Sequence, residues 1–252
     1  MSLYAASLLF SAAIFSMAFL ASRRSGRISV IDLAWGMGFV VSDWLVFWFF
    51  SPKTAANWMV LLLITLWGVR LTAHLHLRNP GKSEDSRYEA LKTKHPSPFG
   101  RFTRVFLPQA LLQWTIGLVS VRLIAFPGIG TGPIFWAGCG LFLAGFFFEA
   151  VSDHQMQAYR KNPANRGILM TRGLRRYSRH PNYFGELLMW WALFLIAAAA
   201  GAYWTILSPL AITFLLLKVS GIPVLEKSFA SRPGWQEYAK KTSKLIPLPP
   251  KK

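Results

Sequence analysis

The stretch "RRYSRHPNYFGE", residues 175–186, gathers cationic side chains in front of a predicted helix. Pro181 suits the first position of that helix, where its missing N–H removes no hydrogen bond. The free N–H groups of a helix start carry partial positive charge and favour anions. Together with the arginines that precede it, which are Arg172, Arg175, Arg176 and Arg179, this helix start predicts a receptor for a phosphate group.

Polar and aromatic side chains in the same stretch extend this chemistry to a nucleotide. Tyr177 and Tyr183 could stack on a base or hydrogen-bond a ribose. Asn182 and Glu186 stand one helical turn apart and could exchange hydrogen bonds with amide or hydroxyl groups. His180 fits the same site, although a hydrogen-bonded structural residue at the helix start is the alternative. We expect a nucleotide cofactor here.

Further ionisable residues recur at helical spacing within or beside apolar segments, where such residues usually have a function. One such stripe holds Glu149, Asp153 and Arg160 on a helix expected to end at Asn162-Pro163. Two others comprise Trp67, Arg70, His74 and Arg78, and Asp32, Gly36, Phe39 and Asp43. With the Asn182 stripe, four helices could converge on one site. The alternative is that Arg70, Glu149 and Glu186 pair to hold the helices together or extend to lipid headgroups.

The elements that position these residues are predicted membrane-spanning helices. The chain has 252 residues, of which 53% are hydrophobic and 15% charged. Seven apolar segments approach the ~20 residues that cross a bilayer: 3–21, 29–50, 58–75, 105–126, 134–151, 183–200 and 203–220. The sequence therefore predicts an all-α polytopic membrane protein with a single seven-helix domain over residues 1–252.

Lysine and arginine concentrate in the segments 22–28, 76–104, 152–182 and 221–252. Because such loops stay in the cytoplasm, we expect the N-terminus outside and the C-terminus in the cytoplasm. The net charge of +18 is assigned to this topology and to attraction to anionic membrane lipids, not to nucleic acid. The segment "LEKSFASRPGWQEYAKK" predicts a basic amphipathic stretch on the membrane surface that could also cover the site.

The sequence contains no residue pattern that predicts a metal site or a disulfide. Cys139 is the only cysteine, which excludes an internal disulfide and a multi-cysteine metal site. No HExxH motif is present either. We expect no metal.

"GLRRYSRHPNYFGE" and the upstream "SDHQMQAYR" resemble the C-terminal domain of the steroid 5-alpha-reductase family, which is related to the sterol reductases. The segments "IDLAWGMGF", "LWGVRL" and "GKSEDSRYEALK" are similar to those of its bacterial branch. The resemblance covers nearly the whole chain, with the diagnostic C-terminal region at 149–248 and the most specific motifs at 149–187.

This resemblance implies a seven-helix membrane reductase with NADPH in a cytoplasm-facing cavity, in the bacterial inner membrane. It would reduce an activated C=C bond of a lipid such as a 3-oxo-4-ene steroid, a sterol or a similar enone. By position, Asp153, Arg160, Asn182 and Glu186 match the family's nucleotide contacts, and Arg70 matches a further phosphate-side arginine.

At the catalytic end the chain departs from the family pattern. The family polarises the substrate ketone with a Gln-Glu pair and a tyrosine, and this chain has no Gln-Glu. Trp67 stands where that tyrosine aligns, and Asp32 is the nearest acid on the corresponding helix. We expect Asp32 and Trp67 at the catalytic position, with Asp32 as the proton donor.

Two alternatives come from other classes of protein. A membrane methyltransferase of the isoprenylcysteine carboxyl methyltransferase type shares R-H-P-x-Y-x-G and binds S-adenosylmethionine. Asn182, Glu186 and the arginine cluster favour the reductase, since S-adenosylmethionine has no pyrophosphate. A transporter or lipid-binding scaffold is the non-enzymatic alternative, and the sequence shows none of the repeat symmetry that transporters commonly have.

Overall fold

The computed structural model describes residues 2–78, 84 and 86–251, and its regular elements are helices, with no strand among these residues. Seven helical segments are long and apolar enough to cross a membrane: Leu3–Ser25, Ile28–Phe50, Ala55–Leu77, Pro98–Ala125, Pro133–Lys161, Pro181–Ala199 and Tyr203–Phe229. The predicted all-α fold and the seven spans are confirmed. The chain is an integral membrane protein.

The helices group into two compact units. The first comprises Met1–Phe135 and Ile196–Ser208, and the second comprises Trp136–Leu195 and Pro209–Lys252. The first unit contains α1 (Leu3–Ser25), α2 (Ile31–Phe50), α3 (Ala55–Arg78), α4 (Ser86–Lys94), α5 (Pro98–Arg101) and α6 (Leu107–Ala125). The second contains most of α7 (Pro133–Lys161), α8 (Pro181–Ala199) and α9 (Leu207–Phe214), with α10 (Ile222–Phe229) and α11 (Trp235–Lys241).

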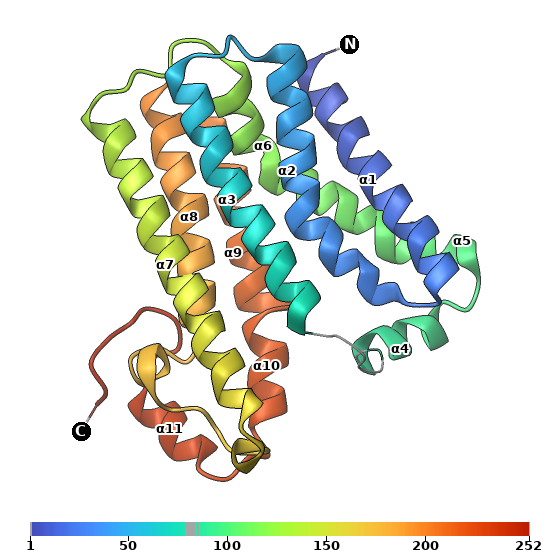
Figure 1. Ribbon diagram of the computed structural model, residues 1–252, viewed down its shortest axis with the longest axis vertical. Helices are drawn as coiled ribbons and strands as arrows, with labels where there is room; N and C mark the ends of the chain where they lie inside the picture. The colour runs from blue at the N-terminus through green and yellow to red at the C-terminus, as the bar shows by residue number, and fades with distance from the viewer. Residues whose placement is uncertain (1, 79–83, 85, 252) are drawn as a thin grey trace. The chain divides into compact units, whose positions relative to one another are not determined.

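In the first unit α1, α2, α3 and α6 pack against one another (Figure 1). A Cβ atom added to Gly36 on α2 would lie 2.7 Å from the carbonyl oxygen of Gly68 on α3, so only glycine allows this close approach. Gln113 on α6 joins two further helices. Its Oε1 accepts a 2.8 Å hydrogen bond from Ser11, and its Nε2 donates one of 2.8 Å to the carbonyl of Ala34.

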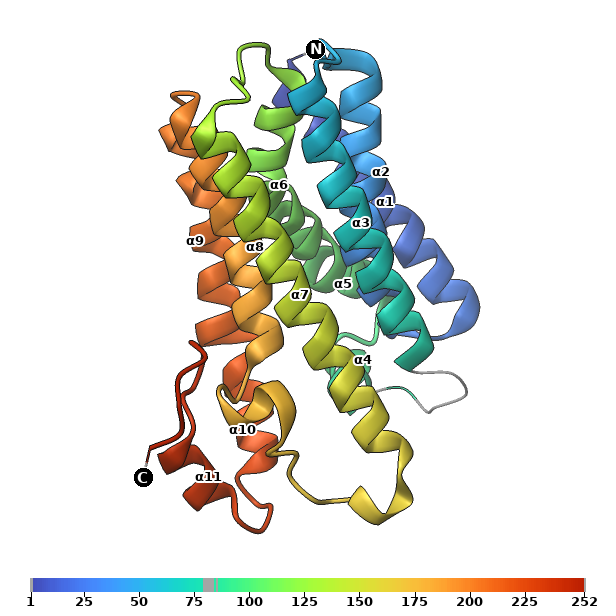
Figure 2. The ribbon, with the colours of Figure 1, turned by 60° about the vertical axis from the view of Figure 1, so that its left-hand side comes forward.

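In the second unit α7 and α8 lie side by side (Figure 2) and touch at two glycines. A Cβ atom on Gly185 would lie 2.6 Å from the backbone nitrogen of Glu149, and one on Gly145 would lie 2.8 Å from Cγ of Met189. The glycine in the NYFGE motif is therefore the residue that lets α8 approach α7.

α7 has 29 residues and so measures about 44 Å, longer than the ~30 Å hydrocarbon core of a bilayer. We assign the excess length to its last turn, because the charged Arg160 and Lys161 lie there. The helix ends at Lys161, and the side chain of Asn162 accepts a hydrogen bond from the backbone N–H of Ala164. The predicted stop at Asn162-Pro163 is confirmed.

The segment that the sequence presents as one basic amphipathic stretch forms two short helices instead. α10 ends at Phe229 and α11 begins at Trp235. Gly234 separates them with a backbone φ of 76°, a conformation that favours glycine. This break turns the chain back, so that α11 and the residues after it pack on the loop before α8.

Candidate cofactor site

The loop before α8 is fixed to α7 through Gln155. Its Oε1 accepts a 3.0 Å hydrogen bond from the backbone N–H of Leu174. Gly173 has a φ of 60° and lies directly against the Gln155 side chain, so a larger residue there would be both strained and crowded. The arginines that follow Gly173 are therefore held beside the last turns of α7.

Arg175 is the buried arginine of this loop, with 7% of its surface exposed. Its Nη1 donates a 2.7 Å hydrogen bond to the carbonyl of Arg179, whereas its Nε has no partner among the described residues. Burial lowers the pKa of Arg175, and the charge of Arg160 acts in the same direction, while Tyr238 and Asp153 oppose it. Arg175 is thus the point at which α7, the loop and α11 meet.

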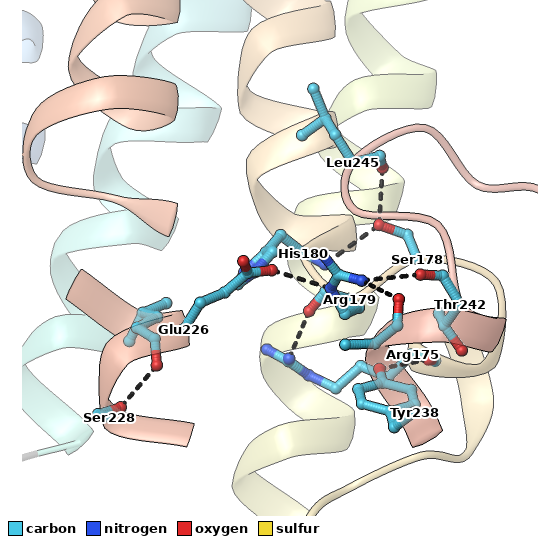
Figure 3. A network of polar contacts seen from close by, with 11 residues as sticks. Arg175, Ser178, Arg179, His180, Glu226, Ser228, Tyr238, Thr242 and Leu245 are labelled. Atoms are coloured by element: carbon cyan, nitrogen blue, oxygen red, sulfur yellow. Dashed lines mark hydrogen bonds and ion pairs between the residues drawn. The ribbon is translucent and has the colours of Figure 1, made fainter. Parts of the chain in front are cut away.

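Arg179 is held by the C-terminal part of the chain (Figure 3). Its Nε donates a 2.8 Å hydrogen bond to Oε1 of Glu226 on α10, and its Nη1 donates to the carbonyls of Ala239 and Thr242 at 2.5 and 3.1 Å. The guanidinium group also lies over the Trp235 ring at 5.5 Å. Among the predicted cofactor residues, Arg179 is therefore one whose charge already has a carboxylate partner.

His180 is fully buried, and its Nε2 lies 3.1 Å from Oε1 of Glu226. A carboxylate can only accept, so Nε2 carries the hydrogen and Nδ1 is an acceptor. Nδ1 has no partner in the part of the chain that the structure describes. Burial lowers the pKa of His180 to about 4, so the ring is neutral at pH 7. It stacks on Tyr183 with 5.8 Å between ring centroids.

Backbone and side-chain hydrogen bonds fasten the residues after α11 to the loop (Figure 3). The N–H of Arg179 donates to the carbonyl of Ser243 at 2.8 Å, and Oγ of Ser178 donates to Leu245 at 2.6 Å. The hydroxyl of Tyr238 donates to the carbonyl of Arg175 at 2.6 Å. Burial raises the pKa of Tyr238 to about 12, so this hydroxyl keeps its proton.

The predicted cofactor residues of the second unit differ in exposure. Glu149 on α7 is buried, with 3% exposed, and the half-buried ones are Asp153, Asn182, Tyr183 and Glu186. Arg160, Arg172 and Tyr177 are exposed. Oδ1 of Asn182 is buried and lacks a partner among the described residues. The electrostatic environment of Arg175 includes Asp153, Arg160 and Tyr183, so these three residues of α7 and α8 lie around one loop.

The remaining predicted site residues belong to the first unit. Trp67 is buried against Phe39, with 5.5 Å between ring centroids, and Arg70 is half-buried on the same helix. Arg78 ends α3, and its side chain lies outside the described residues. Asp32 is half-buried and accepts a hydrogen bond from the hydroxyl of Tyr88.

Sequence reasoning missed Tyr88 as a partner of Asp32. Tyr88 lies on α4, and α4 is held near the start of α2 by Glu84. The Glu84 carboxylate accepts a 2.7 Å hydrogen bond from the N–H of Ser29 and pairs with Lys92. The tyrosine within "SRYEALK" was the available signal, because it is the aromatic residue of a polar helix.

Comparison with known proteins identifies the family to which the chain belongs. Residues 18–242 match the family described as "Protein of unknown function (DUF1295)". The chain belongs to this family. The DUF1295 family is steroid 5-alpha-reductase-like, so the predicted resemblance is confirmed.

One relative of the chain is named as an enzyme. Over 80 residues the chain is 39% identical to 3-oxo-5-alpha-steroid 4-dehydrogenase 1 of Macaca fascicularis, and this stretch covers 30% of each protein. No solved structure matches the chain significantly. The comparisons support an oxidoreductase at the level of the family.

Proposed function

We propose that this DUF1295 member is an NADPH-dependent membrane reductase, which transfers a hydride to an activated C=C bond of a lipid. The substrate class is a 3-oxo-4-ene steroid, a sterol or a similar enone, and the site opens to the cytoplasm. Family membership and the steroid dehydrogenase relative support the reaction class. They do not favour the methyltransferase alternative.

The main support for a bound cofactor is a set of buried polar atoms in the second unit. These atoms have no hydrogen-bond partner in the described part of that unit. They are Oγ of Ser152, Nε of Arg175, Nδ1 of His180 and Oδ1 of Asn182. Buried polar groups are nearly always hydrogen-bonded, so four orphans on α7, the loop and the start of α8 require a polar ligand or water. Nε donates, Nδ1 and Oδ1 accept, and a hydroxyl does both. This mixture fits the phosphates, hydroxyls and amide of a dinucleotide.

The residues proposed to hold NADPH follow from this set. Arg160 and Arg175 would bind phosphate oxygens, for which a guanidinium fork is well suited. Asn182 and Glu186, one helical turn apart, would bind hydroxyl or amide groups. His180 is a positioning residue, because its ring is fixed between Glu226 and Tyr183 and presents a neutral acceptor. When bound, NADPH supplies the hydride.

The chain itself must stabilise the negative charge that develops on the substrate carbonyl oxygen and supply a proton to the α-carbon. We assign this work to the pair formed by Asp32 and Tyr88. The Tyr88 phenol has one proton, which it donates to Asp32 in the free protein. With Asp32 protonated, the carboxyl group would instead donate to the phenol oxygen, so that the phenol can donate to the oxyanion and the carboxyl group can replace a proton that the phenol gives up. Trp67 takes no part in proton transfer in this proposal, since an indole has no acid-base function.

The proposal is tested with the purified protein in detergent. Isothermal titration with NADPH should show one binding site, and adding a 3-oxo-4-ene steroid should then consume NADPH in equal amount to the saturated product. Binding of S-adenosylmethionine with no binding of NADPH would instead establish the methyltransferase. Binding of neither compound would refute the cofactor site.

A further inference from the structure

Residues 243–251 form a strap that is paired with the loop before α8 through backbone hydrogen bonds. The N–H of Arg179 donates to the carbonyl of Ser243 at 2.8 Å, and the N–H of Leu248 donates to the carbonyl of Tyr177 at 3.0 Å. The strap therefore has a fixed place on the loop and is not a free tail.

This place is the edge of a membrane span. The span formed by α8 begins at Pro181, and the carbonyl of Leu245 accepts a 2.6 Å hydrogen bond from Oγ of Ser178, three residues earlier (Figure 3). An extended chain covers at most about 3.6 Å per residue, so Tyr177, four residues before Pro181, lies within about 14 Å of the start of the span. The strap thus lies where the hydrocarbon of a bilayer meets the headgroups.

The backbone of the strap suits an environment with little water. Over residues 247–251 each backbone N–H is either absent or already bonded. The N–H of Leu248 donates to Tyr177, and the N–H of Lys251 donates to the carbonyl of Lys241 at 2.9 Å. The other three residues lack an N–H group, because they are Pro247, Pro249 and Pro250. No donor of this segment therefore needs water, which lowers the cost of contact with lipid.

The side chains of the strap combine apolar surface with positive charge. Ile246 and Leu248 are 57% and 53% exposed. Four exposed lysines lie in and next to the strap, and these are Lys240, Lys241, Lys244 and Lys251. No acidic residue follows Glu237 in the sequence. Apolar side chains between lysines, placed beside the start of a span, match the surface of a bilayer that contains anionic lipids.

We propose that the strap is a membrane-surface anchor that binds anionic phospholipid headgroups. Ile246 and Leu248 enter the boundary between headgroups and acyl chains, and the lysines contact the phosphates. Because the strap is hydrogen-bonded to Tyr177, Ser178 and Arg179, anionic lipid also stabilises the loop before α8. This inference involves neither a cofactor nor a substrate, so it stands or falls separately from the proposed function.

The first experiment locates the strap. The full-length protein carries Cys139→Ala and a single new cysteine, Ile246→Cys, which is labelled with the fluorophore NBD. The matched control is Ala164→Cys on the same background, at an exposed position in the turn after α7. Both proteins are placed in nanodiscs of phosphatidylcholine and phosphatidylglycerol that include a lipid with a nitroxide near its headgroup.

The nitroxide should quench the label at position 246 at least about twofold more than the label at position 164. Equal quenching at the two positions overturns the proposal. A blue-shifted emission at position 246 without quenching by the nitroxide lipid would show that another protein surface covers the strap, and would overturn it as well.

The second experiment tests the anionic lipid through hydrogen exchange. Exchange of the N–H groups of Arg179 and Leu248 is measured in nanodiscs with and without phosphatidylglycerol. Anionic lipid should slow this exchange in the wild type, and Lys244→Gln and Lys251→Gln should each remove about fivefold of the effect. Lys227→Gln, at an exposed lysine of α10, is the control and should behave as the wild type.

Equal exchange of the wild-type protein in the two lipid mixtures overturns the binding of anionic headgroups. A loss in Lys227→Gln as large as in the strap variants would show a general attraction of the protein to anionic lipid, and would overturn the assignment to the strap. The thermal midpoints of the variants should equal that of the wild type in detergent, because the replaced lysines are exposed.

Discussion

Nε2 of His180 lies 3.1 Å from Oε1 of Glu226, which joins the start of α8 to α10 through a single carboxylate oxygen. The same oxygen accepts the 2.8 Å hydrogen bond from Nε of Arg179 (Figure 3). Glu226 of α10 therefore accepts hydrogen bonds from two consecutive residues, Arg179 and His180, of the motif that precedes α8. This motif has a structural role in holding the C-terminal helices, in addition to any role in binding.

Glu226→Ala should destabilise the protein because it leaves the guanidinium of Arg179 without its carboxylate. The side chains of Arg179 and Glu226 are only 11% and 21% exposed, so water compensates little of the loss. We expect the free energy of unfolding to fall by about 2 kcal/mol, measured as a lower thermal midpoint in detergent. Glu237→Ala is the control, because its pair with Lys241 is exposed and should contribute less than about 1 kcal/mol. Equal midpoints for the two variants would contradict the role of Glu226.

The buried His180 predicts a loss of stability in acid. Its pKa is about 4 in the folded protein against 6.5 for an unperturbed histidine. Between these values the unfolded chain binds more protons, so stability decreases as the pH falls from 6.5 to 4 and is unaffected by this group above 6.5. The full effect is about 3 kcal/mol. Thermal midpoints measured across this range should fall less steeply for His180→Asn than for the wild type, and parallel slopes would contradict this prediction.

The positions of the spans could be predicted because the bilayer requires a minimum apolar length of every helix that crosses it. The end of α7 was predictable for a second local reason, the Asn162-Pro163 pair. The separation of α10 from α11 was less evident, although Gly234 is its local signal. The division of the chain into two compact units has no counterpart in the sequence pattern, and the single domain and the orientation of the termini remain predictions.

The sequence allowed the residues of the candidate site to be predicted, but not the side-chain contacts between them. Arg179 was visible as a cation before a helix, but its carboxylate, Glu226, lies 47 residues further along the chain. The hydrogen bond from Leu248 to Tyr177 joins irregular segments, which have no hydrophobic period to reveal a contact. The pairing of Asp32 with Tyr88 joins two helices 56 residues apart, and a helical period predicts which face is buried but not which helix it meets.

Gly185→Ala should separate α7 from α8. The new methyl group would lie 2.6 Å from the backbone nitrogen of Glu149, and backbone atoms cannot move aside as a flexible side chain can. We expect a loss of about 2 to 3 kcal/mol in the free energy of unfolding, observed as a lower thermal midpoint. Gly140→Ala on α7 is the control, because nothing lies within 4 Å of its added Cβ and alanine favours a helix by up to about 1 kcal/mol. A lowered midpoint in both variants would point to a general intolerance of α7 and α8.

Tyr88→Phe should reduce turnover and leave cofactor binding intact. The change removes the hydroxyl that donates to Asp32 and keeps the ring. If the pair supplies the proton, kcat should fall about 100-fold, with the dissociation constant of NADPH within twofold of the wild type. Tyr203→Phe, at a tyrosine that is 68% exposed, should be unaffected. Unchanged turnover in Tyr88→Phe would remove the pair from the proposed reaction and leave the cofactor site untouched.

Asn182→Ala should separate binding from stability. Oδ1 of Asn182 is buried without a partner among the described residues, so its removal relieves an unfavourable group in the free protein. The thermal midpoint should stay the same or rise, whereas NADPH should bind at least about tenfold more weakly, and Glu186→Gln should weaken it as well. Asn57→Ala is the matched control, for which we expect the opposite pattern of stability and binding. Nδ2 of Asn57 donates a 2.8 Å hydrogen bond to the carbonyl of Leu123, so that variant should lose stability and keep the affinity of the folded protein for NADPH. An Asn182→Ala protein that is less stable and binds NADPH normally would show that this side chain serves the fold.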